Sequence, residues 1–447
     1  MSAKSTPASG ELKRNISRMD LISIAAGMII GAGIMAMTGT AIGMTGRSVN
    51  IAFMIAGVLS VITAIPMILV GGTARFRGGQ YTQIAAFGGQ KMAGIFILIN
   101  FFMCLGIAMY ILSFTDYLLA LVPGAPSMLV SVTVLTILFA INILGGKQAA
   151  VLQTIMCAIM AVAIALFIAF GVTNVQPGYF EQPGFMTNGI TGILIASAYL
   201  SFAAGGAAQV VNYSGEAKNP TKDIPFAIIV TTVGISIIYA IMGTIAAGVL
   251  PVEQVANKSL ALVAEVILPR PLYVFFIVGA AMFALLTTLN ASIGWMCRPF
   301  VQAANDGWLP KIFGRLHPKF GTPVAVLIAM YIIGVVPVLM NLDISVVSSA
   351  TAILSSISKT MLCFTALSLP KVMPELWNKS KFHVSNRMLK FLCILGGGVG
   401  VFQVLMLIAT SGMLVFVFNV VMLAASVAYT FVVNKRVKME VSYEDCN

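Results

Sequence analysis

Long apolar runs recur along the whole 447-residue chain. A run of about 20 apolar residues forms a helix long enough to cross the hydrocarbon core of a bilayer, where the backbone has to satisfy its own hydrogen bonds. Only 9% of the residues are charged, whereas a soluble domain has about a quarter. The chain is therefore predicted to be an all-α polytopic membrane protein. We place about 12 transmembrane helices near residues 20–44, 50–72, 93–121, 127–144, 151–173, 189–213, 225–250, 272–298, 321–340, 344–368, 391–410 and 412–434.

Positive charge is distributed unevenly between the predicted loops. If the N-terminus is cytosolic, cytosolic segments hold 22 of the 26 Lys and Arg residues, external segments hold three, and Lys359 lies within a span. This bias follows the positive-inside rule. It predicts a multi-pass protein of the plasma (inner) membrane with both termini cytosolic. It also accounts for the net charge of +12 without nucleic acid, which we do not expect as a partner.

Two predicted spans carry glycine near mid-depth. The first contains Gly31-Ala32-Gly33 about 18 Å along its length, at 1.5 Å per residue. The sixth contains Gly205-Gly206 at a similar depth. Small residues at four-residue spacing also allow close helix packing. However, interrupted helices at corresponding positions of two inverted halves indicate a transporter's binding site, where free N–H groups bind a carboxylate and free carbonyls bind an ammonium group.

Five segments carry a resemblance to a known family. They are "GAGIM" (31–35), "GGQYTQIAAFGG" (78–89), "NILGGKQAAVLQ" (142–153), "GEAKNPTKDIPFAI" (215–228) and "RPFVQAANDGWLPKIFGRLHPKFGTP" (298–323). Together they resemble the amino acid permeases of the amino acid–polyamine–organocation (APC) superfamily. The first segment has Met35 where the family has phenylalanine, and the second lacks the usual preceding proline.

The resemblance implies the inverted five-plus-five helix fold, also called the LeuT-like or APC fold, with helices 1 and 6 interrupted at the midplane. On this basis we expect a cytosolic tail (1–18), a first repeat (19–173), a second inverted repeat (189–370), two peripheral helices (391–434) and a C-terminal cytosolic tail (435–447).

The resemblance also implies a set of substrate-binding residues. Ile29, Gly31, Ala32 and Gly33 would hold the backbone of an amino acid together with Phe202, Ala203 and Gly205. Phe202 falls where many members have an aromatic gate, although an aromatic residue there could equally pack in the core or face lipid. Three further positions fall where the family shapes the side-chain pocket, namely Gly106, Met109 and Ser292.

The distribution of acidic residues bears on the substrate. None of the 14 lies at mid-depth in a predicted span; Asp116 and Glu216 lie near span ends, and Ala208 stands where some antiporters of the family have glutamate. A buried cationic substrate would lack the partner that it needs. A neutral amino acid is therefore favoured over arginine, lysine and polyamines, which stay as alternatives.

Lys359 is the candidate for coupling. It lies about ten residues, or about 15 Å, inside the tenth span, and ionisable residues at such depth are functional candidates by default. It could load and release a proton in symport or exchange, or it could be a structural lysine bound to Ser355 and Ser356. The lysine that many members carry in the fifth span is Met160 here. A sodium site at Gly27, Thr287 and Thr288 is the alternative.

Other classes of protein fit the sequence less well. The two histidines, His317 and His383, lie in predicted loops, so no cluster typical of an enzyme is present. Nothing resembles the charged rings or repeated filter of a channel. We expect no cofactor and no bound structural metal. A non-transporting amino acid sensor on the same fold is the remaining alternative.

Overall fold

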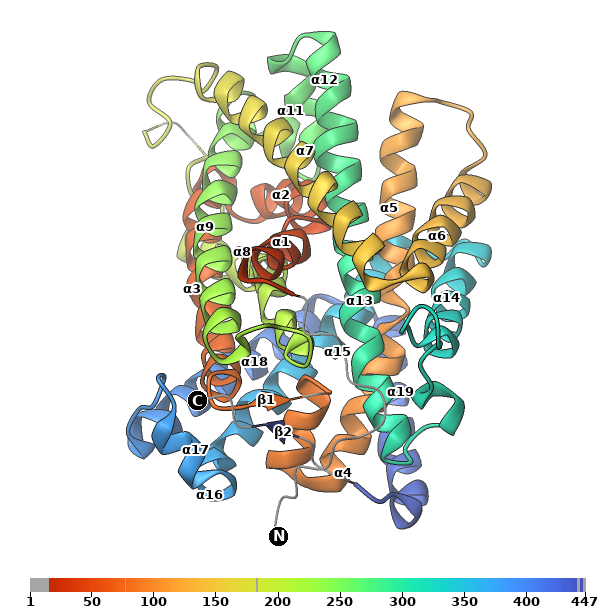
Figure 1. Cartoon of the computed structure of the whole chain (residues 1–447). Coiled ribbons are helices and arrows are strands. Elements are labelled where there is room, and N and C mark those ends of the chain that lie inside the picture. The colour runs from red at the N-terminus through yellow and green to blue at the C-terminus, as the bar shows by residue number, and fades with distance from the viewer. Residues whose placement is uncertain (1–15, 77, 182–183, 440–442, 445–447) are drawn as a thin grey trace.

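The computed structural model describes residues 16–76, 78–181, 184–439 and 443–444, and helices make up most of it (Figure 1). The helices up to residue 172 are α1 (Arg18–Ile29), α2 (Ala32–Thr45), α3 (Val49–Gly71), α4 (Gln80–Met103), α5 (Gly106–Leu121), α6 (Ser127–Leu144) and α7 (Gly146–Val172). The next elements are α8 (Gly189–Ala204), the 3-10 helix η2 (Gly205–Tyr213), α9 (Pro220–Gly248), α10 (Val252–Val255), α11 (Leu260–Ile267), α12 (Arg270–Phe276), the π-helical turn η3 (Ile277–Met282), α13 (Phe283–Asn305), α14 (Val324–Leu339) and α15 (Ile344–Thr365). The last are α16 (Leu369–Val372), α17 (Pro374–Lys379), α18 (Asn386–Thr410), α19 (Met413–Val433) and two short strands, β1 (Arg75–Phe76) and β2 (Tyr443–Glu444).

The helices agree with the predicted membrane spans. In the described part of the chain, 11 helical segments are long and apolar enough to cross a membrane, and the shorter apolar helix α14 corresponds to the ninth predicted span. Many large apolar side chains are exposed on the outside of the bundle, for example Val162, Ile394 and Phe431. Such a surface is stable against lipid rather than water. The prediction of an all-α polytopic membrane protein is confirmed.

The third span begins earlier than predicted. We expected it near residue 93, but α4 already begins at Gln80. The helix bends at Gly89, where φ is +81°, a left-handed conformation that favours glycine. The segment before this bend contains Gln80, Gln83 and other polar residues, so hydropathy alone does not separate it from a loop.

The first and sixth predicted spans change conformation where their glycines lie. The α1 helix ends at Ile29 and α2 begins at Ala32, so that Ile30 and the extended residue Gly31 form a short non-helical step. The sixth span does not unwind in the same way. At Gly205 it passes from the α-helix α8 into the 3-10 helix η2, which continues to Tyr213.

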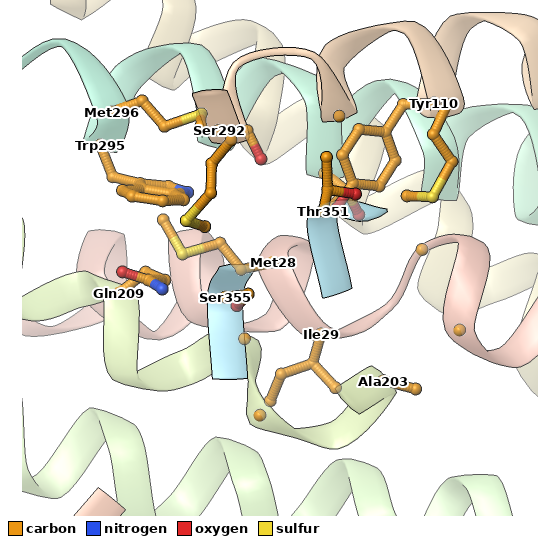
Figure 2. Close-up of a pocket in the computed structure, with 18 of the residues that line it drawn as sticks. Met28, Ile29, Tyr110, Ala203, Gln209, Ser292, Trp295, Met296, Thr351 and Ser355 are labelled. Carbon is orange, nitrogen blue, oxygen red and sulfur yellow. The ribbon is translucent and has the colours of Figure 1, made fainter. Parts of the chain in front are cut away.

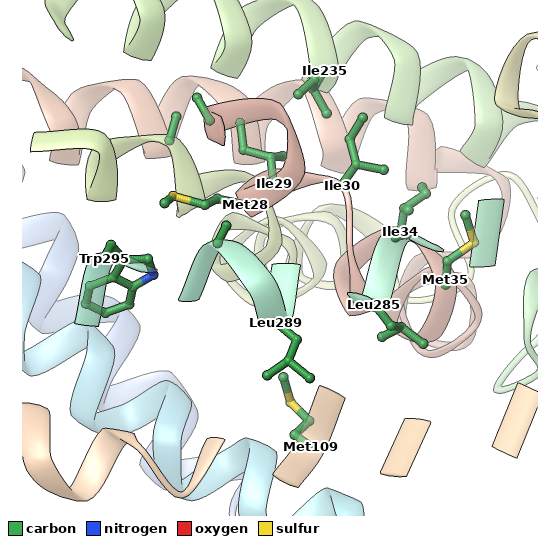
Figure 3. Close-up of a cluster of buried hydrophobic side chains, with 14 of the residues drawn as sticks. Met28, Ile29, Ile30, Ile34, Met35, Met109, Ile235, Leu285, Leu289 and Trp295 are labelled. Carbon is green, nitrogen blue, oxygen red and sulfur yellow. The ribbon is translucent and has the colours of Figure 1, made fainter. Parts of the chain in front are cut away.

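The step between α1 and α2 lies in the centre of the molecule. Met28, Ile29, Ile30 and Ile34 are all buried, and they pack with side chains from α9 and α13 (Figure 3). These partners include Ile235, Leu285 and Leu289. The step is thus enclosed by surrounding helices, as non-helical backbone within a membrane has to be.

The two ends of the described chain meet at one end of the bundle. Strand β2, near the C-terminus, pairs antiparallel with β1, and Ile16 forms a parallel bridge with Ala217. Arg75, in β1, donates a hydrogen bond to the carbonyl of Ala217. At this end, which we call the terminal end, Arg298 of α13 also forms an ion pair with Glu216, which follows η2.

Candidate functional site

A cavity of about 100 Å³ lies beside the step between α1 and α2 (Figure 2). Residues from seven α-helices and the 3-10 helix η2 line it. They are Met28, Ile29, Gly31 and Gly33 of the first span, Met103, Gly106, Ile107, Met109 and Tyr110 of α4 and α5, Ala203, Gly205, Gly206 and Gln209 of α8 and η2, Thr288, Ser292, Trp295 and Met296 of α13, and Thr351, Ser355 and Lys359 of α15.

The predicted substrate-binding residues lie around this cavity. The structure describes the side chains or glycine positions of eight of them, and all eight line it: Ile29, Gly31, Gly33, Gly106, Met109, Ala203, Gly205 and Ser292. The side chains of Ala32 and Phe202 lie outside the described part of the structure. Lys359, predicted for coupling rather than for binding, lines the same cavity. Residues far apart in the sequence therefore form one site, whose binding role is still a prediction.

The amide end of α2 faces the cavity. The first N–H groups of an α-helix have no partner within the helix, and Gly31, the N-cap residue of α2, has no side chain with which to cap them. Gly31, at its N-cap position, and Gly33 both line the cavity. A helix N-terminus also carries a partial positive charge, so this end is suited to a carboxylate.

The carbonyl end of α1 is largely occupied by side chains. The Tyr239 hydroxyl of α9 donates a 2.7 Å hydrogen bond to the carbonyl of Ile29. The Thr288 hydroxyl of α13 lies 2.7 Å from the Gly27 carbonyl and 3.2 Å from that of Ile30. These contacts occupy part of the carbonyl end of α1, and they fix α1 against two neighbouring helices.

Glycine allows the first and sixth spans to approach closely. A Cβ added to Gly33 would lie 2.3 Å from the Cβ of Ala203, and one added to Gly206 would lie 2.3 Å from the carbonyl oxygen of Met28. Non-bonded carbon atoms prefer a separation of about 3.5–4 Å. Even alanine would therefore push the two spans apart at these positions.

Lys359 reaches the cavity from α15. Thr351, Ser355 and Lys359 follow one another at four-residue spacing, which places them on one face of the helix. The amine of Lys359 lies against Gly205, because a Cβ added to that glycine would be 2.8 Å from Nζ. Gly205 directly follows the last residue of α8, so the amine lies at the junction between α8 and η2.

The sequence did not single out several residues of the cavity wall. Trp295 and Met296 lie three and four residues after Ser292, so they share its face of α13. Tyr110 lies four residues after Gly106 and shares its face of α5. That spacing was the available signal. Gln209 could not be found in this way, because η2 departs from the α-helical period of 3.6 residues.

The residues of the alternative sodium site form hydrogen bonds of their own. The Thr287 hydroxyl donates to the carbonyl of Ala284, one turn earlier in α13. Gly27 faces the side-chain amide of Gln153, since a Cβ added to Gly27 would lie 1.9 Å from Nε2. Gln153 lies in the fifth span, before Met160, the residue expected at the position where many family members carry a lysine. In the structure Gln153, a hydrogen-bond donor without charge, contacts the first span there.

The described residues that line the cavity include one lysine and no acidic residue. Of the two acidic candidates near span ends, Asp116 is exposed. Glu216 is bound to Arg298, whose Nε and Nη2 donate to its two carboxylate oxygens over 2.5 and 2.9 Å. Neither carboxylate lines the cavity. The cavity therefore has a positive rather than a negative character.

Comparison with known proteins identifies the family. The family model described as "Amino acid permease" matches residues 16–439. The chain is similar to the branched-chain amino acid permease BcaP of Bacillus subtilis, with 28% identity over 70% of this chain and 72% of the relative. It is also 25% identical to the methylthioribose transporter of Bacillus subtilis, over 70% of this chain and 72% of the relative. For the chloroplastic cationic amino acid transporter 9 of Arabidopsis thaliana, the identity is 26% over 69% of this chain and 58% of the relative. The chain belongs to the amino acid permease family of the APC superfamily.

Proposed function

We propose that this amino acid permease carries neutral amino acids with apolar side chains across the plasma membrane. The observation that carries the proposal is the cavity: it combines the free amide end of α2 with a wall that contains no acidic residue among those described. The amides would bind the substrate carboxylate, as helix N-termini bind anions. Ile29, Gly31, Ala32 and Gly33 would form this part of the site, opposite Phe202, Ala203 and Gly205.

The wall supports an apolar side chain in the substrate. Four methionines, Met28, Met103, Met109 and Met296, line the cavity together with Ile107 and Trp295. Methionine side chains are flexible and adapt to apolar ligands of different shapes. The name of the Bacillus subtilis branched-chain permease agrees with such a substrate.

A cationic side chain fits the cavity poorly, although some relatives are named as cationic amino acid transporters. Its charge would face the Lys359 amine with no acidic residue among the described wall residues. Two like charges 4 Å apart repel by about 4 kcal/mol at an effective dielectric constant of about 20. That energy corresponds to about a thousandfold loss of affinity.

Transport would proceed by alternating access between two inverted repeats, 19–173 and 189–370, with the helices of 391–434 at the periphery. In such folds one group of helices rocks against another around a central site. Both termini would be cytosolic. The first and sixth spans would supply the binding surface, and Lys359 would couple transport to a proton in symport or exchange.

Proton coupling is favoured over sodium coupling by the contacts of the first span. A sodium ion needs several oxygen ligands, whereas Gln153 directs its amide nitrogen at Gly27, and the hydroxyls of Thr287 and Thr288 lie within hydrogen-bonding distance of backbone carbonyls. The Lys359 amine, in contrast, is an ionisable group within the cavity.

Competition for uptake tests the substrate class. Purified protein in liposomes should take up radiolabelled L-leucine, and an excess of L-isoleucine, L-valine or L-methionine should reduce that uptake by tenfold or more. L-arginine, L-lysine and putrescine should leave it unchanged, because each adds a positive charge to the cavity. Efficient competition by putrescine, which has no carboxylate, would contradict the role of the α2 amides. Binding without uptake would favour the amino acid sensor.

A further inference from the structure

The amine of Lys359 occupies the region where the amine of a bound amino acid has to lie. A substrate whose carboxylate binds the amide end of α2 at Gly31 and Gly33 places its ammonium group, one carbon away, towards the facing residues Ala203 and Gly205. This region is the junction between α8 and η2. Nζ of Lys359 already lies against Gly205.

No negative charge from the described wall residues compensates a second cation. Tyr110 of α5, Gln209 of η2 and Met103 of α4 line the same cavity. Ser60 of α3 lies near Gly205. The thiol of Cys363 lies one turn along α15, and that of Cys393 in α18 interacts with it. Phenol and thiol groups are ordinarily neutral near pH 7. Two ammonium groups in a cavity of about 100 Å³ therefore repel each other strongly.

We propose that the proton on Lys359 and the ammonium group of the substrate exclude each other. When an amino acid binds, the N–H bond at Nζ breaks and the proton passes to water on the side to which the cavity is open. When the amino acid leaves, Nζ takes up a proton from the side then open. This inference rests on the proposed function and decides between symport and exchange. Symport needs the charged Lys359 amine and the substrate ammonium group in the cavity at the same time. Transport becomes an exchange, in which a proton moving inward along its gradient drives an amino acid outward.

Calorimetric titration of the purified protein tests the exclusion directly. L-leucine is titrated at pH 6 and pH 7 in buffers with different enthalpies of ionisation, which measures the protons released per bound molecule. We expect close to one proton and an affinity that rises about tenfold over this pH unit, as linkage requires. The matched ligand is 4-methylpentanoate, which has the same carboxylate and side chain but no amine. It should bind without releasing a proton.

Two variants assign the proton to its residue. Lys359→Met keeps the length and apolar bulk of the side chain, and it should bind L-leucine with no proton release and no change in affinity between pH 6 and pH 7. Lys390→Met removes a charge from the exposed surface of α18 and should behave like the parent. In liposomes with an acidic exterior, the parent and Lys390→Met should expel L-leucine against its gradient, and Lys359→Met should not.

Three results would overturn the inference. L-leucine that binds the parent with no proton release excludes the mechanism while leaving the proposed substrate class intact. Proton release that persists in Lys359→Met assigns it to another group. Failure of the parent to bind any neutral amino acid removes the proposed function and this inference together. The measurements on the parent decide the matter even if Lys359→Met does not fold.

Discussion

Replacement of Gly33 by leucine is expected to abolish amino acid binding and uptake. The new side chain has to enter either the contact with α8, where even a Cβ would lie 2.3 Å from that of Ala203, or the cavity that both residues line. In the first case the spans are pushed apart, and in the second the place of the carboxylate is filled. Uptake of L-leucine in liposomes and calorimetric binding measure the loss, which should exceed a hundredfold.

A paired substitution controls for damage to packing. Gly33→Ala alone should lower the free energy of unfolding by about 1–3 kcal/mol, as overpacking of a close contact does. Combining it with Ala203→Gly moves the same methyl group to the other side of the contact. The double variant should recover stability and uptake to within severalfold of the parent. A stable Gly33→Leu protein with unchanged affinity for L-leucine would assign these glycines to helix packing alone.

Loss of the ion pair between Arg298 and Glu216 is expected to cause the largest loss of stability among single substitutions at the terminal end. Arg298 is 16% exposed and Glu216 19%, and the guanidinium also lies 3.8 Å from the centre of the Tyr213 ring. Arg298→Met leaves the carboxylate without this partner in a mostly buried place. Removal of one partner from a buried pair costs about 3–5 kcal/mol, which partial exposure reduces here to about 2–3 kcal/mol.

The second ion pair at the same end is the control. Arg18 binds Asp223 over 2.7 Å; the Arg18 side chain is 50% exposed, whereas that of Asp223 is 5% exposed. Asp223→Asn removes the buried charge and leaves Arg18 accessible to water, so it should lower the free energy of unfolding by about 1 kcal/mol or less, as for a surface pair. The double variant Arg298→Met/Glu216→Gln should recover part of the loss, because no charge is left unpaired. Equal losses in Asp223→Asn and Arg298→Met, measured by denaturant unfolding in detergent, would contradict the importance of leaving a buried charge without its partner.

The two ion pairs also connect helices to one another at the terminal end. Arg298 in α13 binds Glu216, which lies after η2, and Arg18 in α1 binds Asp223, near the start of α9. Both pairs connect segments of the first or sixth span region to other helices. Any movement of α1 and η2 relative to α9 and α13 during transport has to separate or displace these contacts.

The sequence by itself determined the fold class and the position of most spans. An apolar run of sufficient length forms a helix in a bilayer, so each run could be assigned as a span without knowledge of the rest of the chain. The same reasoning from local sequence identified the glycines of the α1–α2 step and Gly205. It failed at Gln80, where polar residues begin the helix before the apolar run, and it did not predict that the sixth span continues as the 3-10 helix η2.

Only the tertiary structure decided which residues share the cavity. Lys359 and Gly205 are distant in the sequence, and their contact depends on how α15 packs beside η2. Likewise, the sequence did not indicate which residue of the fifth span faces Gly27, and the rotation of α7 places Gln153 there. Hydropathy fixes that a helix lies in the membrane but not its rotation or its neighbours, because lipid is as apolar as the side chains that face it. Those choices are made by close packing of small residues and by hydrogen bonds between helices.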